Sequence, residues 1–175
     1  MNLIKTKFKG TYIINHKKNK DFRGYFMRGF CKNEFIKRKI KFDIKQTNFS
    51  FNKSKFTLRG FHYQARPFSE DKIITCAKGE IFVVLININK KSKHYLKHLK
   101  IRLDEKLNKS LLISKNCAAA FLTLKKNTLV FYYMSNFYKK RKDLGIRYND
   151  PKLKINWPYK PKVISNRDKN FKDLN

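Results

Sequence analysis

Short runs of β-branched and aromatic residues recur along most of the chain and predict an all-β fold. Several of these runs alternate apolar and polar residues, most clearly 98–103, which is typical of a strand with one buried face. Strands this short, with turns about every 8–12 residues, indicate an antiparallel barrel or sandwich. The seven runs expected to form strands are 11–14, 40–44, 72–76, 81–88, 98–103, 110–113 and 128–133.

The segments between these runs contain few helical signals. Residues 33–37 and the basic stretch after Tyr138 are the two candidates for short helices. Gly79 lies between two expected strands and predicts a tight turn. We expect the polar tail, about residues 150–175, to wrap the barrel as an extended strap. The whole of 1–175 is expected to form one domain.

Composition supports a folded protein with a hydrophobic core. Of the 175 residues, 15% are aromatic, which excludes a largely disordered chain. No run approaches the roughly 20 apolar residues of a membrane-spanning helix, and the first residues lack the apolar stretch of a secretory signal. Cys31, Cys76 and Cys117 show neither a CxxC pair nor zinc spacing, so we expect free thiols in a reducing compartment. The expected location is the cytoplasm.

The chain is strongly basic, with 43 Lys and Arg against 12 Asp and Glu and a formal net charge of +31. One interpretation is a coding sequence biased towards A and T, because Lys, Asn and Ile are abundant together; the other is a functional positive surface. A nucleic-acid-binding barrel is one such hypothesis. However, the basic residues are scattered, the longest cluster is 139–142, and no recognised nucleic-acid motif is present. In either case a phosphate-bearing ligand would be attracted.

The segment 58–64, LRGFHYQ, contains the first candidate for chemistry, His62. It is the only histidine in the middle of a strand-like run with other polar residues on its face, although a lone histidine is more often structural than catalytic. Metal-binding cupin barrels place two histidines one residue apart before a carboxylate, whereas Tyr63 and Gln64 follow His62, so no metal site is expected. If the segment is a regular strand, its two faces consist of Arg59, Phe61 and Tyr63, and of Gly60, His62 and Gln64.

Eight short motifs follow one another in a fixed order between about residues 10 and 170. They are DFRGYF at 21–26, QTNFS at 46–50, LRGFHYQ at 58–64, KIITCAKG at 72–79, YYMSNFY at 132–138, GIRYNDP at 145–151, INWP at 155–158 and ISNRD at 164–168. Each motif is weak alone. Together, in register, they resemble the motifs of the dTDP-4-dehydrorhamnose 3,5-epimerase family.

The resemblance implies a fold and an activity. The fold is a double-stranded β-helix (cupin or jelly-roll) barrel with minor short helices, which forms a homodimer by exchanging N-terminal strands, here about residues 1–50. The activity is that of an isomerase that inverts C3, C5 or both in a nucleotide-linked 4-keto-6-deoxy sugar. Neither a metal nor an organic cofactor is implied. The pathway implied is dTDP-rhamnose and polysaccharide biosynthesis.

The resemblance also implies four catalytic residues. His62 would be the base that removes a proton next to the ketone, and Asp168 would hold the other imidazole nitrogen. Lys72 would stabilise the enolate oxygen, and Tyr132 would return a proton from the opposite face.

Six further residues are implied in substrate binding: Arg23, Phe26, Gln46, Asn48, Arg59 and Tyr138. The two arginines would clamp the diphosphate, because a guanidinium fork fits phosphate oxygens. For Arg23 and Phe26 the alternative is a dimer-interface contact, and for Tyr138 it is packing.

Four departures from the family pattern affect the expected pocket. Ala119 stands where a histidine is expected, Ala120 replaces a glycine, Val83 replaces an acidic residue, and Arg28 occupies a position that is commonly Glu. The alternatives left open are epimerisation at one carbon, a different nucleotide, a non-catalytic binder of sugar nucleotides, and a related ketoisomerase.

Overall fold

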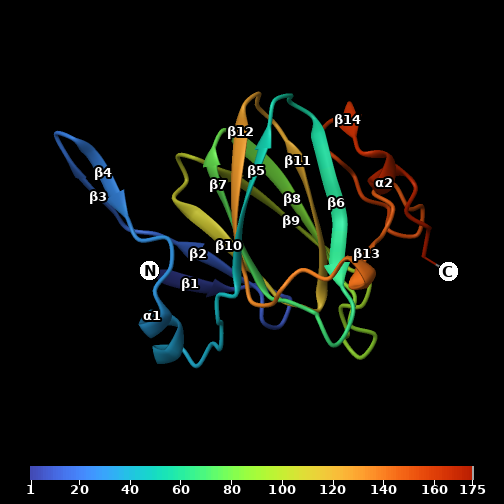
Figure 1. The fold of residues 1–175 in the computed structure, drawn as a ribbon, viewed down its shortest axis with the longest axis horizontal. Helices are drawn as coiled ribbons and strands as arrows, with labels where there is room; N and C mark the ends of the chain where they lie inside the picture. Colours follow the sequence, from blue (N-terminus) through green and yellow to red (C-terminus); the bar gives the residue numbers. More distant parts are fainter. Residues whose placement is uncertain (175) are drawn as a thin grey trace.

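The computed structural model describes residues 1–174, which form two facing β-sheets (Figure 1). The first sheet has the order β1 (Asn2–Lys5), β2 (Tyr12–Asn15), β10 (Lys109–Ile113), β7 (Lys72–Lys78), β12 (Thr128–Met134) and β5 (Gln46–Asn52). The second has the order β13 (Asp143–Gly145), β6 (Thr57–Gln64), β11 (Cys117–Thr123), β8 (Glu80–Asn87) and β9 (His98–Asp104). Neighbouring strands are antiparallel, except that β14 (Val163–Ile164) lies parallel to β6. The predicted all-β jelly-roll fold is confirmed.

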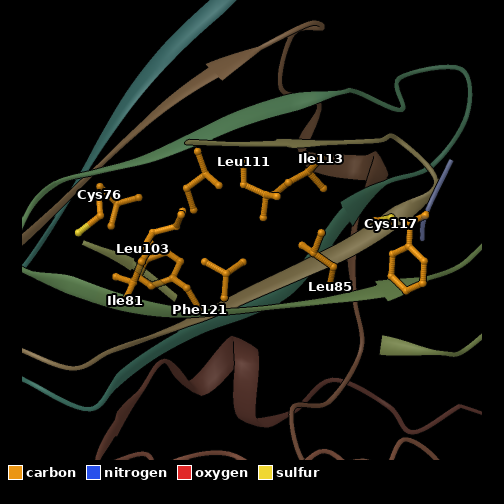
Figure 2. Packing of buried hydrophobic residues seen from close by; sticks show 12 residues of the cluster. Cys76, Ile81, Leu85, Leu103, Leu111, Ile113, Cys117 and Phe121 are labelled. Atoms are coloured by element: carbon orange, nitrogen blue, oxygen red, sulfur yellow. The ribbon is translucent and has the colours of Figure 1, made fainter. Parts of the chain in front are cut away.

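The core lies between the two sheets, as Figure 2 shows. Register explains how the first sheet buries residues on both faces. Ile74 pairs with Leu111 and belongs to the core between the sheets, whereas the next pair, Ile73 with Leu112, packs on the outer face. That outer face is covered by Phe35 of α1 (Lys32–Lys37) and by neighbouring residues. Both faces are therefore buried here, and β7 and β10 each contain consecutive apolar residues, Ile73–Ile74 and Leu111–Ile113.

The C-terminal tail covers the outer face of the second sheet (Figure 1). Leu153 and Trp157 pack there against Phe61 of β6. The tail then continues through β14 into α2 (Asn166–Lys169), where the Ser165 side chain accepts a hydrogen bond from the Asp168 backbone N–H and caps the helix. The expected strap is present, but it is not extended throughout.

Six of the seven expected strands are confirmed, and the seventh, 40–44, is wrong. No strand forms there; instead Phe42 is buried against the outer face of the first sheet, with Ile40 and Ile44 packed beside it. The alternation of apolar and polar residues in 40–44 arises because Ile40, Phe42 and Ile44 pack against the sheet without pairing as a strand. The turn at Gly79 is confirmed, with φ +82°, and the helix predicted at 33–37 is α1. The basic stretch after Tyr138 forms one short 3₁₀ turn, η1 (Lys140–Lys142).

A hairpin of β3 (Lys18–Asp21) and β4 (Gly24–Met27), not expected from the sequence, projects away from both sheets (Figure 1). Phe22 at its tip is 99% exposed. Cys31, Cys76 and Cys117 are free and at least half-buried, as predicted. Among residues 1–174, no helix has the length and apolar character needed to cross a bilayer.

Candidate active site

A cavity of about 250 Å³ opens among β5, β6, β7, β11 and β12. Its wall is mostly apolar, with contributions from Ile74, Ile113 and Phe121, among others. Polar side chains converge on it from four different strands. Five of the residues implicated by the sequence line this cavity: Asn48, Arg59, His62, Lys72 and Tyr132. A largely apolar concavity with a few convergent polar groups is typical of a small-molecule site.

Arg59 and His62 both line the cavity, although regular alternation along β6 places them on opposite faces. Arg59 pairs with Phe121 and His62 with Ala119, so the register shifts between these two pairs. Two residues of β6 therefore oppose one residue of β11, which is a β-bulge. The predicted face for Arg59 is wrong for this reason, whereas Phe61 does point outwards, into the cluster beneath the C-terminal tail.

Gly60 makes this bulge possible. Its φ is +114°, and a Cβ there would lie 2.5 Å from the Ala119 carbonyl oxygen and 2.7 Å from the Ala120 Cα. Only glycine fits such a close approach of two backbones.

His62 forms a close pair with Asp168, whose Oδ1 lies 2.8 Å from Nε2 of the imidazole. The second carboxylate oxygen, Oδ2, accepts a hydrogen bond from the Gly60 backbone N–H at 2.9 Å. In the neutral imidazole, donation from Nε2–H to the carboxylate leaves Nδ1 unprotonated and able to accept a proton. The tail of the chain thus fixes the orientation and the tautomer of a histidine on β6.

Asp168 is 4% exposed and stays ionised. Burial by itself raises the pKa of this carboxyl, but the hydrogen bonds from His62, the Gly60 N–H and Ser165 outweigh it and hold the pKa below its ordinary value. A fixed negative charge behind the imidazole stabilises the imidazolium that forms when His62 takes a proton.

Tyr132 lies on β12, paired with Ile74 on one side and Asn48 on the other. Burial raises the pKa of its hydroxyl well above the ordinary value, an effect that the nearby Arg59 guanidinium only partly opposes. The phenol therefore remains protonated throughout the neutral range and is available as a proton donor.

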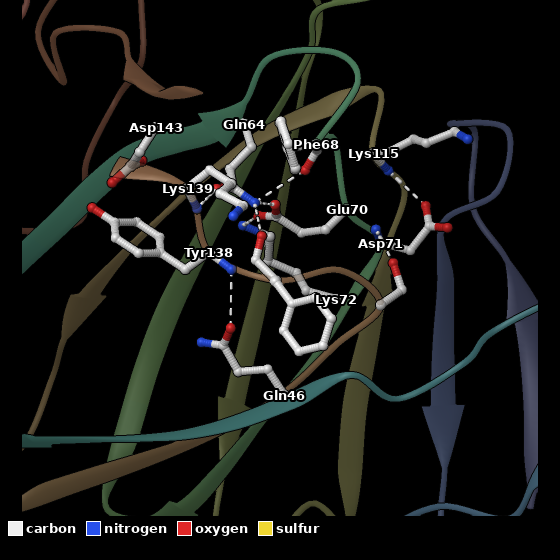
Figure 3. Close-up of polar contacts among 12 residues, drawn as sticks. Gln46, Gln64, Phe68, Glu70, Asp71, Lys72, Lys115, Tyr138, Lys139 and Asp143 are labelled. Carbon is white, nitrogen blue, oxygen red and sulfur yellow. Dashed lines mark hydrogen bonds and ion pairs between the residues drawn. The ribbon is translucent and has the colours of Figure 1, made fainter. Parts of the chain in front are cut away.

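Lys72 is paired with Glu70, whose Oε1 lies 3.0 Å from the Lys72 ammonium (Figure 3). Both side chains are largely buried, at 11% and 4% exposure. Sequence reasoning did not identify Glu70. The available signal was its spacing, because residues two apart in an extended chain share a face.

Three further polar contacts hold the candidate substrate-binding residues. The Arg59 Nε donates to the buried Asn52 side-chain oxygen at 2.8 Å. Gln46, which does not line the cavity, donates to the Asn48 side chain at 3.1 Å and accepts a hydrogen bond from the Tyr138 backbone N–H at 3.0 Å. These contacts hold Arg59 and Asn48 in fixed positions at the cavity wall.

Tyr138 lies outside the cavity and is 51% exposed. The pKa of its hydroxyl is raised by burial and by the neighbouring Asp143. Arg23 and Phe26 also lie outside the cavity, on the projecting β3–β4 hairpin, where Arg23 pairs with Asp21 at 2.7 Å. Within one chain, Arg23 and Phe26 do not meet the other candidates, and Tyr138 meets them only through its backbone contact to Gln46.

The three apolar replacements noted in the sequence all line the same cavity. Val83 on β8 and Ala119 on β11 are part of its wall, together with Ala120. The inner end of the site therefore has neither an imidazole nor a carboxylate from these positions. Within residues 1–174, His, Cys, Asp and Glu side chains form no group of three or more that could hold a metal ion.

Comparison with known proteins points to one family. The family model described as dTDP-4-dehydrorhamnose 3,5-epimerase matches residues 5–175. A dTDP-4-dehydrorhamnose 3,5-epimerase from Shigella flexneri is 34% identical over 173 residues, covering 97% of this chain and 94% of the relative.

Solved structures agree. The dTDP-4-dehydrorhamnose 3,5-epimerase from Bacillus anthracis, with TDP and PPi bound, superposes with a TM-score of 0.95 at 27% identity, covering 99% of both chains. A dTDP-6-deoxy-D-glucose-3,5-epimerase from Legionella pneumophila, in complex with dTDP-4-keto-L-rhamnose, superposes with a TM-score of 0.90 at 29% identity, covering 95% of this chain and 89% of that one.

Proposed function

The chain belongs to the dTDP-4-dehydrorhamnose 3,5-epimerase family and is an isomerase, and we propose that it inverts C3 and C5 of dTDP-4-keto-6-deoxyglucose with the residues of this cavity. The observation that carries the proposal is the convergence of an Asp168-supported His62, a protonated Tyr132 and the ammonium of Lys72 on one cavity.

The proposed reaction follows from the acidity of hydrogens next to a ketone. Nδ1 of His62 removes the proton from C3, and the electron pair moves through the C3–C4 bond onto the C4 oxygen, giving an enolate. The Lys72 ammonium stabilises that oxygen. Tyr132 then delivers its proton to the opposite face of C3. Solvent returns a proton to the phenolate and takes one from the imidazolium, and the same cycle at C5 completes the reaction.

Arg59 is proposed to bind the diphosphate, since its guanidinium lines the cavity and its Nε is held by Asn52. Asn48 lines the same wall and would hydrogen-bond the nucleotide or the sugar, with Gln46 fixing its side chain. Tyr138 and its segment would form the outer edge of the site, through the Gln46 contact to its backbone.

Arg23 and Phe26 are proposed to act in a homodimer. Both are well exposed on a hairpin that projects from its own chain, and Phe22 and Tyr25 beside them are exposed as well. A second copy would cover these aromatic residues and receive Arg23 near its own site. The three free cysteines fit the proposed cytoplasmic location.

One observation favours a second candidate function, epimerisation at a single carbon or on another nucleotide. Val83 and Ala119 place two apolar side chains in the cavity where the family resemblance expects an acid and a histidine. Without an acidic side chain and an imidazole at these two positions, proton transfer at C3 or at C5 can lose a polar group that stabilises it.

Solvent exchange tests the proposal. The protein is incubated in heavy water with dTDP-4-keto-6-deoxyglucose, and deuterium at C3 and C5 is followed by NMR. We expect label at both carbons with inverted product; label at one carbon would indicate a single epimerisation. His62→Ala should abolish the exchange, whereas His98→Ala, on β9 and outside the cavity, should not. Exchange at the wild-type rate in His62→Ala would refute the assignment of the base.

A further inference from the structure

Lys72 reaches the cavity as one member of a buried ion pair. Its partner, Glu70, does not line the cavity, yet its side chain is only 4% exposed. A buried carboxylate is costly unless it is paired and hydrogen-bonded. Both conditions are met, because one oxygen faces the Lys72 ammonium and the other accepts from the Gln64 amide.

Gln64 connects this pair to two other parts of the site. It lies on β6, two residues after His62, so the Glu70–Lys72 pair is tied to the strand of the proposed base. Its amide nitrogen also approaches the Phe68 and Phe137 carbonyl oxygens, at 3.0 and 3.1 Å. Its oxygen accepts from the Lys139 backbone N–H at 2.7 Å, as Figure 3 shows.

Phe137 and Lys139 belong to the segment that directly follows β12, the strand of Tyr132. One buried amide thus fixes Glu70 relative to β6 and to the segment after β12. Gln64 thus connects three of the four elements that carry proposed catalytic groups: β6 itself, β7 through Glu70, and β12 through the segment that follows it. The carboxylate of Glu70 has little freedom to move.

We propose that Glu70 is the positioning residue for Lys72, holding the ammonium where the C4 enolate oxygen forms; this inference rests on the proposed function. A lysine side chain is flexible, and an ammonium stabilises an enolate best when it is already in place. Of its three N–H donors, one is directed at Glu70 and two remain for the substrate. Glu70 acts through Lys72 and has no contact with substrate.

Two substitutions distinguish the position of the Glu70 carboxylate from its charge. Glu70→Asp keeps the charge but withdraws the carboxylate by one methylene. Glu70→Gln keeps the reach and an acceptor oxygen for Lys72, but it removes the charge and places an NH2 donor opposite the Gln64 amide nitrogen. We expect kcat for Glu70→Asp to fall about 10-fold, with a much smaller change in KM, since the lost interaction belongs to the transition state. Glu70→Gln should retain more activity than Glu70→Asp, because its oxygen still reaches Lys72, although its melting temperature should be below that of the wild type.

Glu80→Asp is the matched control. Glu80 is also a buried carboxylate paired with a cation, but its partner, Arg102, does not line the cavity, whereas Lys72 does. Its substitution should lower the melting temperature without lowering kcat. Melting temperatures of both Glu70 variants show whether each protein is folded under the assay conditions.

A double-mutant cycle with Lys72→Met gives the decisive result. If Glu70 works through Lys72, then Glu70→Asp reduces deuterium exchange in the wild-type background and has no further effect in the Lys72→Met background. Equal effects in both backgrounds, or a Glu70→Asp variant as active as Glu70→Gln, would overturn the inference while leaving the proposed function intact. A wild-type protein without exchange on any 4-keto sugar nucleotide would contradict both.

Discussion

Arg59 and His62 are three residues apart on β6, yet both face the same cavity because a β-bulge lies between them. The bulge brings the proposed diphosphate ligand and the proposed base to one wall. It also leaves the Gly60 N–H free of the ladder with β11 and directed at Asp168, which holds His62. One local irregularity thus places a binding group, a base and the support of that base.

Gly60→Ala should destabilise the protein. A side chain at φ +114° costs about 1–3 kcal/mol, and the added Cβ would also meet the Ala119 oxygen at 2.5 Å. We expect a melting temperature lower by at least about 5 °C and a loss of activity. Gly24→Ala is the control, because Gly24 also has a positive φ but nothing within 4 Å of an added Cβ. An equal effect of both substitutions would show that the contact with β11 is not important.

Asp168→Asn should leave the fold intact and reduce the rate. An asparagine can donate a hydrogen bond to Nε2, which favours the tautomer with its proton on Nδ1, the atom proposed to accept a proton from substrate. We expect kcat to fall at least about 100-fold, as found when the support of a catalytic imidazole is altered. Deuterium exchange at C3 measures this directly. Activity close to that of the wild type would mean that Nδ1 is not the base.

The sequence predicts six of the fourteen strands formed by residues 1–174, and these six contain β-branched residues, as in 81–88. β11 was missed because Cys117–Thr123 begins with small residues of weak strand preference; its conformation is set by pairing with β6 and β8 on either side. The apolar segment 40–44 was misassigned because packing against a sheet and pairing within one give similar patterns.

The candidate site was predictable only in part, for similar reasons. His62, Lys72 and Tyr132 were found through the family motifs and do meet in one cavity. The face of Arg59 depends on the bulge, which arises from contact with a distant strand. The burial of Glu70 likewise depends on Gln64 and on the segment after β12, and no local pattern contains that information.

Acid should weaken the attachment of the N-terminal strands through His16. This side chain is 7% exposed, with Nδ1 donating to the Arg28 carbonyl and Nε2 accepting from the Ser110 hydroxyl at 2.7 Å. Burial lowers the pKa of His16, an effect only partly opposed by the bond to Arg28. The unfolded chain therefore binds a proton more readily, and stability is lost as the pH falls below about 6.5 and through the folded-state pKa.

Urea denaturation between pH 7.5 and 5 measures this loss, whose limit is about 1.4 kcal/mol per pH unit for one group. His16→Gln should flatten the profile. The pKa of His98 is also lowered, by burial and by nearby lysines, and His98→Gln is the matched comparison. A profile unchanged by His16→Gln would assign the acid sensitivity elsewhere.

Tyr132→Phe should separate proton removal from inversion. Without the phenol, His62 can still remove a proton and return a deuteron from the same face, after exchange of the imidazolium with solvent. We expect deuterium to enter C3 or C5 of the substrate while the inverted product forms at least about 100-fold more slowly, the range for loss of a general acid. Tyr133→Phe is the control, because Tyr133 packs with Phe30 on the outer face of the first sheet. The pH profile adds a second readout. Because burial raises the pKa of Tyr132, the phenol should stay protonated above pH 10, and ionisation of Tyr132 should not stop inversion by the wild type there. Loss of exchange together with inversion in Tyr132→Phe would mean that the phenol takes part in removing the proton, and the assignment of base and acid to opposite faces would have to be reversed.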